Sequence, residues 1–221
     1  MSTNARIAPD ADRTETTRRR YNRVARTYDL EQGLLEKVGL GRLRRTLWSW
    51  LGPGEVLEVG VGTGASFRDY PRDRKLTAID LSEEMLRRAE KRADREGVDV
   101  DLRVMDAQRM DFPDASFDSV VGCCVFCSVP DPLLGLSEVG RVLRPGGRAL
   151  FLEHVRSENA VFGRLMDLVN PMTVRMSGAN INRRTVENIR LAGFEVVREE
   201  KHMFGLVRLV EARRPGASIE E

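Results

Sequence analysis

The sequence holds a glycine-rich stretch, EVGVGTGASF, which starts at Glu58 and has the composition of a turn that binds a nucleotide-like ligand. Gly60, Gly62 and Ala65 match the pattern G-x-G-x-x-G/A, which is typical of dinucleotide sites in nicotinamide-dependent oxidoreductases. The same stretch also reads E-x-G-x-G-x-G, ending at Gly64. In both patterns the glycines let the backbone approach a ligand without a Cβ in the way. The two patterns predict different ligands, so other residues must distinguish them.

Three acidic residues at the predicted ends of three successive strands favour a ligand with an amino group. Glu58 lies two residues before Gly60, where its carboxylate would repel a pyrophosphate and attract an ammonium. Asp80 can accept hydrogen bonds from both hydroxyls of a ribose, as in either ligand class. Asp106, followed by Ala107, is placed to accept from an adenine amino group. Because three nearby acids repel one another unless a ligand bridges them, a zwitterionic amino-acid ligand suits the site better than a dinucleotide.

The chain resembles the class I S-adenosylmethionine-dependent methyltransferases in five motifs, over a region from about Tyr21 to Ile189. The motifs are E-V-G-V-G-T-G (58–64), A-I-D-L-S-E-E-M-L (78–86), V-M-D-A (104–107), F-P-D-A-S-F-D (112–118) and V-L-R-P-G-G (142–147). A lone glycine motif is weak support, but five motifs in order are specific. The resemblance implies an enzyme whose cofactor is S-adenosyl-L-methionine.

The resemblance also implies a role for each residue of the glycine turn and of the second strand end. Glu58 and Gly60 would lie near the amino end of the methionine part of the cofactor. Gly62 and Gly64 would lie beneath the cofactor, and Asp80 would bind the ribose. The alternative for the glycines is that they only make the turn.

The remaining cofactor contacts implied by the resemblance come from the next two strand ends. Leu81 and Met85 would pack against the adenine, although both could equally belong to the hydrophobic core. Asp106 and Ala107 would recognise the edge of the adenine. Cys123, after the fourth strand, would line the methionine side.

Candidate catalytic residues are Tyr21, Tyr28 and His154, with Glu153 as a further acid near the expected site. The sulfonium methyl is already electrophilic, so the protein mainly has to hold a nucleophile in line and help it lose a proton. His154 follows the fifth strand, where it could be a general base or a structural histidine. Tyr21 and Tyr28 are seven residues apart and would share one helix face. They could cover the cofactor and present ring faces to a cationic amine, or simply pack in the core.

The methyl acceptor is expected to be a lipid or another small apolar molecule. The motifs are similar to those of bacterial phospholipid N-methyltransferases, which methylate phosphatidylethanolamine. The stretch CSVPDPLLGLSEVGRVLRPGG, starting at Cys127, with the later FLEHV, is similar to membrane-associated thiol S-methyltransferases. Quinone C-methyltransferases have related motifs. A nicotinamide-dependent oxidoreductase and a cofactor-binding scaffold without activity are the alternative classes, and no nucleic-acid partner is expected.

Charge is distributed unevenly along the 221 residues, whose net charge is +2. Residues 1–51 contain 11 Lys and Arg against 6 Asp and Glu, which leaves the remainder of the chain negative. This basic end could contact an anionic membrane, or it could be an ordinary solvated helix face. Neither a membrane-spanning apolar run nor a secretory signal is present, so we expect a cytoplasmic protein that could lie peripherally on the inner face of the membrane.

The three cysteines, Cys123, Cys124 and Cys127, lie together in the apolar run VVGCCVFCSV. Cys124 and Cys127 form C-x-x-C, which occurs in redox and metal sites. A zinc site would need further ligands, and only His154 and His202 could provide imidazoles. We therefore expect thiols buried at a strand end and no metal.

The N-terminal part is predicted to consist of a tail and a helical cover. Residues 1–13 are expected to be disordered, and residues 14–51 to form two amphipathic helices that act as a lid. In the second helix an apolar stripe lies beside arginines. The stripe consists of Leu34, Val38, Leu40, Leu43, Leu47, Trp50 and Leu51, with Trp48 beside it. Such a helix could rest on an anionic bilayer or pack on the domain.

Residues 52–221 are predicted to form the methyltransferase domain. Strands are expected at 56–59, 76–79, 98–104, 117–123, 148–152, 194–199 and 206–211, with helices between them, the first from about Ala65 and the second capped by Ser82. An apolar helical insertion at about 155–182 would cap the substrate, with Met166, Met172 and Met176 covering the acceptor. The last two strands are so close that they must pair antiparallel. The sequence therefore predicts an α/β fold, a Rossmann-like doubly wound sheet of seven strands, mostly parallel with one antiparallel strand.

Overall fold

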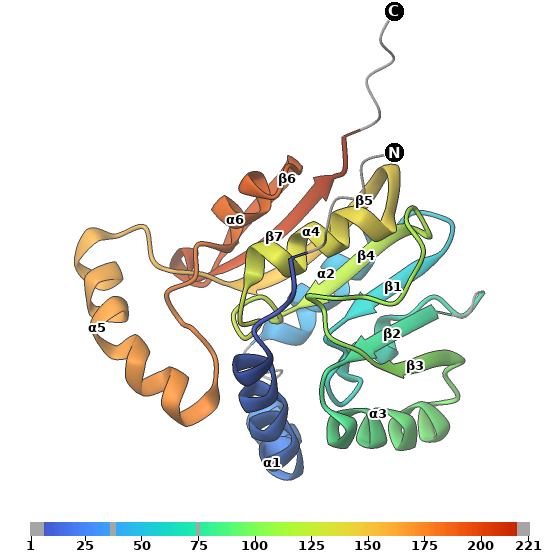
Figure 1. Ribbon diagram of the computed structural model, residues 1–221, viewed down its shortest axis with the longest axis horizontal. Coiled ribbons are helices and arrows are strands. Elements are labelled where there is room, and N and C mark those ends of the chain that lie inside the picture. The colour runs from blue at the N-terminus through green and yellow to red at the C-terminus, as the bar shows by residue number, and fades with distance from the viewer. Residues whose placement is uncertain (1–6, 36–38, 74–75, 216–221) are drawn as a thin grey trace, which may run out of the picture.

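The computed structural model describes residues 7–35, 39–73 and 76–215, which form one seven-stranded sheet with helices on both faces (Figure 1). The strands are β1 Val56–Val59, β2 Leu76–Asp80, β3 Val100–Val104, β4 Phe117–Cys123, β5 Leu143–His154, β6 Glu195–His202 and β7 Val207–Arg213. The helices are α1 Ala11–Leu35, α2 Gly41–Trp48, α3 Glu83–Glu96, α4 Pro132–Val142, α5 Ala160–Ser177 and α6 Thr185–Leu191. Two short 3₁₀ helices are η2 Ala65–Asp69 and η3 Met203–Gly205.

The strand order β3-β2-β1-β4-β5-β7-β6 confirms the predicted fold class. All pairs from β3 to β5 are parallel, and β7 runs antiparallel to both β5 and β6. Only η3 and one further residue join β6 to β7, and so short a connection cannot reverse the chain twice. A doubly wound parallel sheet of this kind gathers its loops at the carboxyl ends of the strands, where ligands bind.

Two hydrophobic clusters hold the layers together, one on each face of the sheet. Neighbouring residues of a strand point to opposite faces, so Val120 belongs to one cluster and Val121 to the other. The first cluster packs beneath α4 and α6, and includes Leu136 and Ile189. The second packs beneath α2 and α3, and includes Leu47 and Ala89. Both faces of the central strands are therefore buried, as parallel strands require.

The N-terminal helix α1 is longer than predicted and begins within the expected tail. Residues 11–13 were expected to be disordered, but they form the first turn of α1. The Asp10 carboxylate accepts from the Arg13 backbone N–H at 3.1 Å, and the Arg13 guanidinium donates to the Pro130 carbonyl at 2.9 Å. These contacts fix the start of the helix against the loop that precedes α4. Residues 1–6 lie outside the described residues.

The apolar side of α2 packs on the domain, which is the second of the two alternatives that the sequence leaves open for this helix. Leu47 and Trp48 are buried in the core, and the Trp48 ring packs on Tyr70 with 4.6 Å between the ring centroids. Trp50 is half-buried beneath the Arg198 guanidinium, 4.0 Å from its ring centroid. The apolar stripe of this segment faces the sheet because it forms part of the second hydrophobic cluster. The side chains of Leu34 and Val38 lie outside the described part of the structure.

The helix predicted from Ala65 is reduced to the five residues of η2. Phe67 and Tyr70 turn into the core, where their rings pack edge to face with 5.1 Å between centroids. Pro71 follows, and the residue before a proline is pushed to extended backbone, as Tyr70 is. A longer helix would withdraw these aromatic rings from the sheet.

Helix α5 lies within the predicted insertion and stands apart from the body of the molecule (Figure 1). Met172 and Met176, expected to cover an acceptor, are 58% and 73% exposed. The described residues that line the main pocket do not include them. The expectation that these methionines cap the substrate is therefore not supported by their position. No described helix is both long and apolar enough to cross a membrane.

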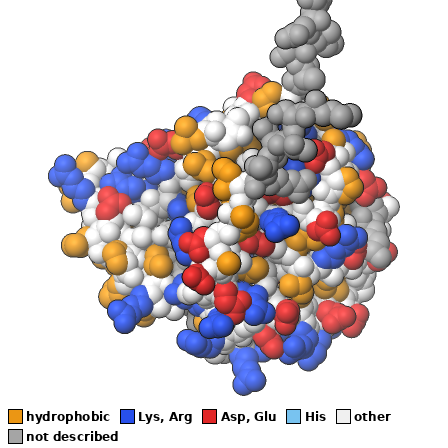
Figure 2. Space-filling model, in the orientation of Figure 1, with side chains coloured by type: hydrophobic (Ala, Val, Ile, Leu, Met, Phe, Trp, Pro, Cys, Tyr) orange, Lys and Arg blue, Asp and Glu red, His pale blue; other side chains and the backbone are white. Residues whose placement is uncertain are grey.

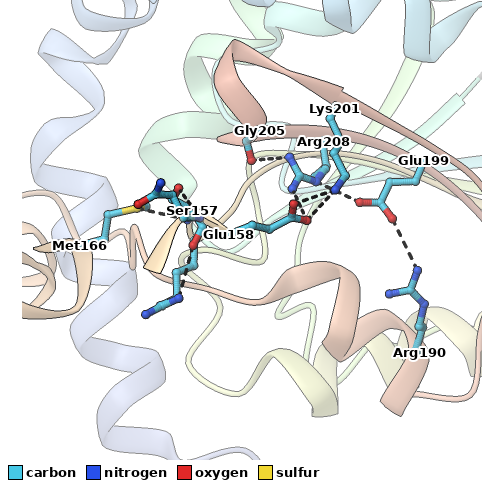
Figure 3. A network of polar contacts seen from close by, with 10 residues as sticks. Ser157, Glu158, Met166, Arg190, Glu199, Lys201, Gly205 and Arg208 are labelled. Atoms are coloured by element: carbon cyan, nitrogen blue, oxygen red, sulfur yellow. Dashed lines mark hydrogen bonds and ion pairs between the residues drawn. The ribbon is translucent and has the colours of Figure 1, made fainter. Parts of the chain in front are cut away.

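A polar network anchors the segment before α5 to the last two strands (Figure 3). The Glu158 carboxylate accepts from Lys201 at 2.7 Å and from the Arg208 guanidinium at 2.9 Å. Arg208 is almost fully buried and also donates to Glu199 at 2.9 Å. Because a buried guanidinium needs such partners, the network holds the base of α5 in one place.

Candidate active site

The main pocket lies at the carboxyl ends of the central parallel strands, beneath α1. Its walls come from five segments. They are Val59, Gly60 and Gly62 after β1; Ile79, Asp80, Leu81 and Met85 from β2 to α3; Met105, Asp106 and Ala107 after β3; Cys123, Cys124, Val125, Ser128, Val129 and Pro130 after β4; and Thr17, Tyr21 and Tyr28 of α1. The structure therefore brings together most of the residues that the sequence pattern singles out.

The glycine turn after β1 needs glycine for two different reasons. Gly60 has a φ of +67°, and a Cβ there would lie 2.6 Å from the Val125 side chain on the pocket wall. Gly64 has a φ of +80° and abuts the Phe67 ring, so it shapes the turn. Gly64 does not appear among the described residues of the pocket wall, whereas Gly60 and Gly62 do. The predicted contact of Gly64 with the cofactor stays a prediction.

Asp80 closes the turn from the neighbouring strand. One carboxylate oxygen accepts from the Gly62 N–H at 2.9 Å, and the other accepts from the Ser82 N–H at 2.8 Å. Burial raises the pKa of Asp80, while these backbone hydrogen bonds lower it. Asp80 also lines the pocket, and each carboxylate oxygen can accept more than one hydrogen bond. Asp80 therefore has the acceptors that ribose hydroxyls require.

Asp106 and its neighbours form the other end of the pocket. The Asp106 carboxylate accepts from the Gln108 N–H at 2.9 Å and from the Thr14 hydroxyl of α1 at 3.3 Å. Ala107 and the almost fully buried Met85 provide apolar surface on the same wall. An acidic acceptor beside apolar surface suits a flat base that carries an amino group. The predicted contacts of these residues with adenine are compatible with that geometry and stay predictions.

Glu58 is held by the core rather than by the pocket. Its carboxylate accepts from the Ser66 hydroxyl at 2.6 Å and from the Tyr70 hydroxyl. It is 1% exposed and is absent from the described pocket wall. Burial raises the pKa of Glu58 to about 7. The expected contact of Glu58 with a ligand ammonium is thus replaced by two internal hydrogen bonds to η2 and the residue after it.

The cysteine thiols behave as neutral apolar groups. Cys127 is buried as expected, whereas Cys123 and Cys124 are partly exposed and line the pocket. Burial raises the pKa of Cys123 and Cys127 to about 12, so the nucleophilic thiolate is scarce at neutral pH. In the described ranges, no cluster of three His, Cys, Asp or Glu side chains could hold a metal ion.

Tyr21 and Tyr28 both reach the pocket from α1, as predicted from their spacing. Their ring centroids are 6.5 Å apart at an interplanar angle of 69°, so they form an edge-to-face pair. The Tyr21 hydroxyl is 2.5 Å from the Ser128 hydroxyl. Burial raises the pKa of both phenols, so they remain neutral hydrogen-bonding groups. They can orient an acceptor with hydroxyl and ring faces, but they are poor general bases.

His154 and Glu153 are not positioned as a general base for an acceptor in the pocket would be. His154 ends β5 opposite Val207 and is not among the described wall residues, and burial lowers its pKa. Glu153 accepts from the backbone N–H groups of Val125 and Phe126 at 2.9 and 3.0 Å. Burial raises the pKa of Glu153 to about 7. The predicted catalytic role of His154 is therefore not supported by the geometry, and Glu153 shapes the pocket loop after β4.

Sequence reasoning missed the polar residues that fasten α1 over the pocket. The Asn22 carbonyl oxygen accepts from the Ser82 hydroxyl at 2.6 Å and from the Glu84 N–H at 3.3 Å. Ser128 binds Tyr21 from the opposite wall. The sequence offers one indication of a role for Asn22, namely its position next to Tyr21 on a predicted helix. No spacing in the sequence indicates its partner at Ser82.

Comparisons with known proteins agree with this geometry. Residues 57–151 match the family described as "Methyltransferase domain". Over 169 residues, 72% of the chain, the protein is 32% identical to a ubiquinone/menaquinone biosynthesis C-methyltransferase of Roseobacter denitrificans, and 67% of that relative is covered. The chain belongs to the class I S-adenosylmethionine-dependent methyltransferases.

Two further similarities extend this assignment. The methyltransferase is 45% identical over 103 residues to a phosphatidylethanolamine N-methyltransferase of Cereibacter sphaeroides, covering 46% of this chain and 51% of that one. The chain thus spans about half the length of this curated relative. An S-adenosylmethionine-dependent methyltransferase structure from Thermotoga maritima superposes with a TM-score of 0.68 at 22% identity, over 90% of this chain and 99% of that chain. The structural match supports the fold.

The pocket of this methyltransferase fits S-adenosylmethionine, the cofactor of the family. Asp80 offers the carboxylate acceptors that a ribose would need, and Asp106 offers one beside the kind of apolar wall that an adenine would need. Gly60 and Gly62 present backbone without side chains to the remaining part. The donor and acceptor set is therefore compatible with the ligand at three points, while Glu58 and Gly64 are predicted contacts that do not appear among the described wall residues.

Proposed function

We propose that this methyltransferase transfers the cofactor methyl group to the amino nitrogen of a phosphatidylethanolamine-type phospholipid. The observation that carries this proposal is the pair of neutral tyrosines, Tyr21 and Tyr28, on the pocket wall. Aromatic ring faces attract an ammonium or a partly charged amine, and they offer nothing comparable to a thiolate. The similarity to a phosphatidylethanolamine N-methyltransferase supports the same acceptor.

In the proposed reaction the cofactor supplies an electrophilic methyl group, and the chain supplies position. Asp80 and Asp106 would orient the ribose and the adenine of the cofactor, while Tyr21 and Tyr28 would hold the amine. The bound ammonium would first lose a proton to solvent. The lone pair of the neutral amine would then form the new N–C bond as the S–C bond breaks, which leaves a methylated ammonium and a neutral thioether. Such positioning lowers a barrier by several kcal/mol without a strong base. This explains a pocket wall whose phenols and thiols are neutral.

The exposed surface of helix α5 supports the proposal that the acceptor is a lipid in a bilayer. Its exposed apolar residues recur at helical spacing along the whole helix, and Arg164 and Arg175, which are exposed, follow one edge of this stripe. The residues of the stripe, which are all more than half exposed, are Val161, Phe162, Leu165, Leu168, Met172 and Met176. Figure 2 shows hydrophobic and basic side chains together at the end of the molecule where α5 lies. A helix of this kind lies in the interface of an anionic membrane.

The membrane contact is tested by sedimentation with phosphatidylglycerol vesicles at low salt. Leu168→Asn should weaken binding about tenfold or more, because a buried leucine side chain contributes roughly 1.5–3 kcal/mol. The matched control is Leu191→Asn at the end of α6, since Leu191 is 69% exposed and lies outside the stripe. Failure of the parent protein to bind these vesicles, or equal losses in both variants, would contradict the role of α5.

The activity itself is tested with labelled S-adenosylmethionine and three acceptors in separate reactions. Phosphatidylethanolamine in mixed micelles should yield labelled N-methylated phospholipid. A demethylated quinone tests the second candidate, C-methylation, which the Roseobacter denitrificans relative favours. A soluble alkyl thiol tests S-methylation. Label in the quinone or the thiol, with none in the phospholipid, would refute the proposal.

A further inference from the structure

A second pocket adjoins the cofactor pocket and shares three of its wall residues, Thr17, Ser128 and Pro130. It lies between the first turns of α1, the loop after β4 and the segment that follows α5. Thr16 of α1 and Val174 of α5 are among its lining residues. Because the two pockets share a wall, a molecule bound in the second can extend into the first.

Three arginines from distant parts of the chain line this second pocket: Arg13, Arg20 and Arg183. The Arg13 and Arg183 guanidinium groups each donate one hydrogen bond to the loop after β4, to the carbonyls of Pro130 and Val129 at 2.9 Å. The Arg20 side chain lies against Gly178, where a Cβ would come within 2.6 Å of it. The loop and Gly178 thus hold the three side chains in place and leave most of their N–H donors free.

The three arginines make no ion pair with a carboxylate in the described part of the chain. Arg18 and Arg19 of α1, in contrast, both pair with Glu15. The Arg183 Nε is buried and finds no hydrogen-bond partner in the described residues. A buried donor without a partner is costly, so the geometry favours an anion that accepts from it.

Electrostatics in the pocket agree with an anion site. Burial lowers the pKa of Arg183 and the positive charge of Arg13 lowers it further, while Cys127, Asp131 and Glu153 act in the opposite direction. Asp12 also lines the pocket and Asp131 acts on Arg183, but the Asp131 side chain accepts from the backbone at the start of α4. Three cations against the one acid on the wall leave a net positive pocket. Planar guanidinium groups match the oxygens of a phosphate.

We propose that Arg13, Arg20 and Arg183 bind the phosphodiester of the methyl acceptor. The phosphate would occupy the second pocket, and the two-carbon bridge of an ethanolamine head group would carry the amine past Ser128 towards Tyr21. The shared wall and the hydrogen bond between Ser128 and Tyr21 place the amine subsite directly beside the phosphate subsite. This inference rests on the proposed function in one respect, the identity of the amine that is attached to the phosphate.

The direct test is calorimetry. The protein is first saturated with S-adenosylhomocysteine, and three soluble probes are then titrated into it in separate experiments. Glycerophosphoethanolamine carries the phosphodiester and the amine, ethanolamine carries the amine alone, and inorganic phosphate carries the anion alone. Arg20→Gln should weaken the binding of glycerophosphoethanolamine about tenfold, since a hydrogen bond to a charged group is lost. The affinity for ethanolamine should not change. The matched control is Arg19→Gln, which removes the same charge from an exposed residue paired with Glu15.

The second part of the test measures enzyme kinetics. Arg20→Gln should raise the KM for phosphatidylethanolamine about tenfold and leave the KM for a long-chain alkylamine, which has no phosphate, unchanged. Equal effects of Arg20→Gln and Arg19→Gln would overturn the subsite, because they would report general charge. Inorganic phosphate that binds as tightly as glycerophosphoethanolamine would overturn the diester assignment in favour of a free phosphate. Probe binding that depends on Arg20 in a protein that methylates no phospholipid would support the subsite and refute the proposed function.

Discussion

The burial of Glu58 predicts a stability that falls as the pH rises above the acid range. Burial is the largest cause of the rise in its pKa from 4.5 to about 7, and the hydroxyl donors Ser66 and Tyr70 offset only part of it. The folded protein therefore holds a proton that the unfolded chain releases near pH 4.5. Stability from this proton is fully present below the unfolded pKa and is lost as the pH rises through about 7.

The size of the effect follows from the two pKa values. A difference of this size corresponds to roughly 3 kcal/mol between fully protonated and fully ionised Glu58. Replacing the residue by Gln keeps the shape of the side chain and removes the titration. Glu58→Gln should therefore gain stability relative to the parent by up to roughly 3 kcal/mol between about pH 5 and pH 8. Glu153 titrates in the same sense and His154 in the opposite one, and both cancel in the difference.

The assay is urea unfolding at several pH values, followed by tryptophan fluorescence and far-ultraviolet circular dichroism. The buried Trp48, stacked on Tyr70, reports on the neighbourhood of Glu58. Glu90→Gln, at an exposed position of α3, is the control for a change of net charge. If the difference between the parent and Glu58→Gln stays constant from pH 5 to pH 8, the reasoning about burial of this carboxylate is refuted.

Three further predictions concern the pocket and the core. Asp80→Ala should weaken the binding of S-adenosylhomocysteine about tenfold or more in calorimetry, since acceptors for the ribose are lost. An unchanged affinity would reject the pocket assignment. Trp48→Ala should cost about 3–5 kcal/mol in urea unfolding because the ring is buried, and the fluorescence of Trp48 should not respond to vesicles. Cys127→Ser should keep most turnover, because the Cys127 thiol is neutral and bonded to the Cys124 carbonyl at 3.3 Å, and the parent should bind no zinc on elemental analysis.

The main elements of the fold follow from local patterns. The predicted strand at 117–123 is β4 without change, and Ser82 caps α3 by accepting from the Met85 N–H at 3.2 Å. Periodicity and caps involve neighbouring residues only, so the sequence displays them directly. The same patterns failed at η2, where the packing of Phe67 and Tyr70 in the core decides the conformation.

The candidate site was predictable to the extent that it follows from topology. Parallel strands bring their carboxyl ends to one edge, so Gly60, Asp80 and Asp106 were expected together and are found on one pocket wall. The direction of Glu58 was not predictable in this way. Strand β1 is buried on both faces, so alternation gives no hint of which side chains face the ligand and which face the core.

The sequence by itself determined the family, the fold class and the residues at the strand ends, because these depend on short motifs and on rules of chain connection. Only the tertiary structure decided which partners the isolated charges have. Arg13 and Arg183 meet across a pocket although they lie at opposite ends of the chain, and Arg20 meets Gly178 after α5. Such contacts depend on how α1 and α5 pack against the loop after β4, and side-chain packing between distant segments leaves no periodic trace in the sequence.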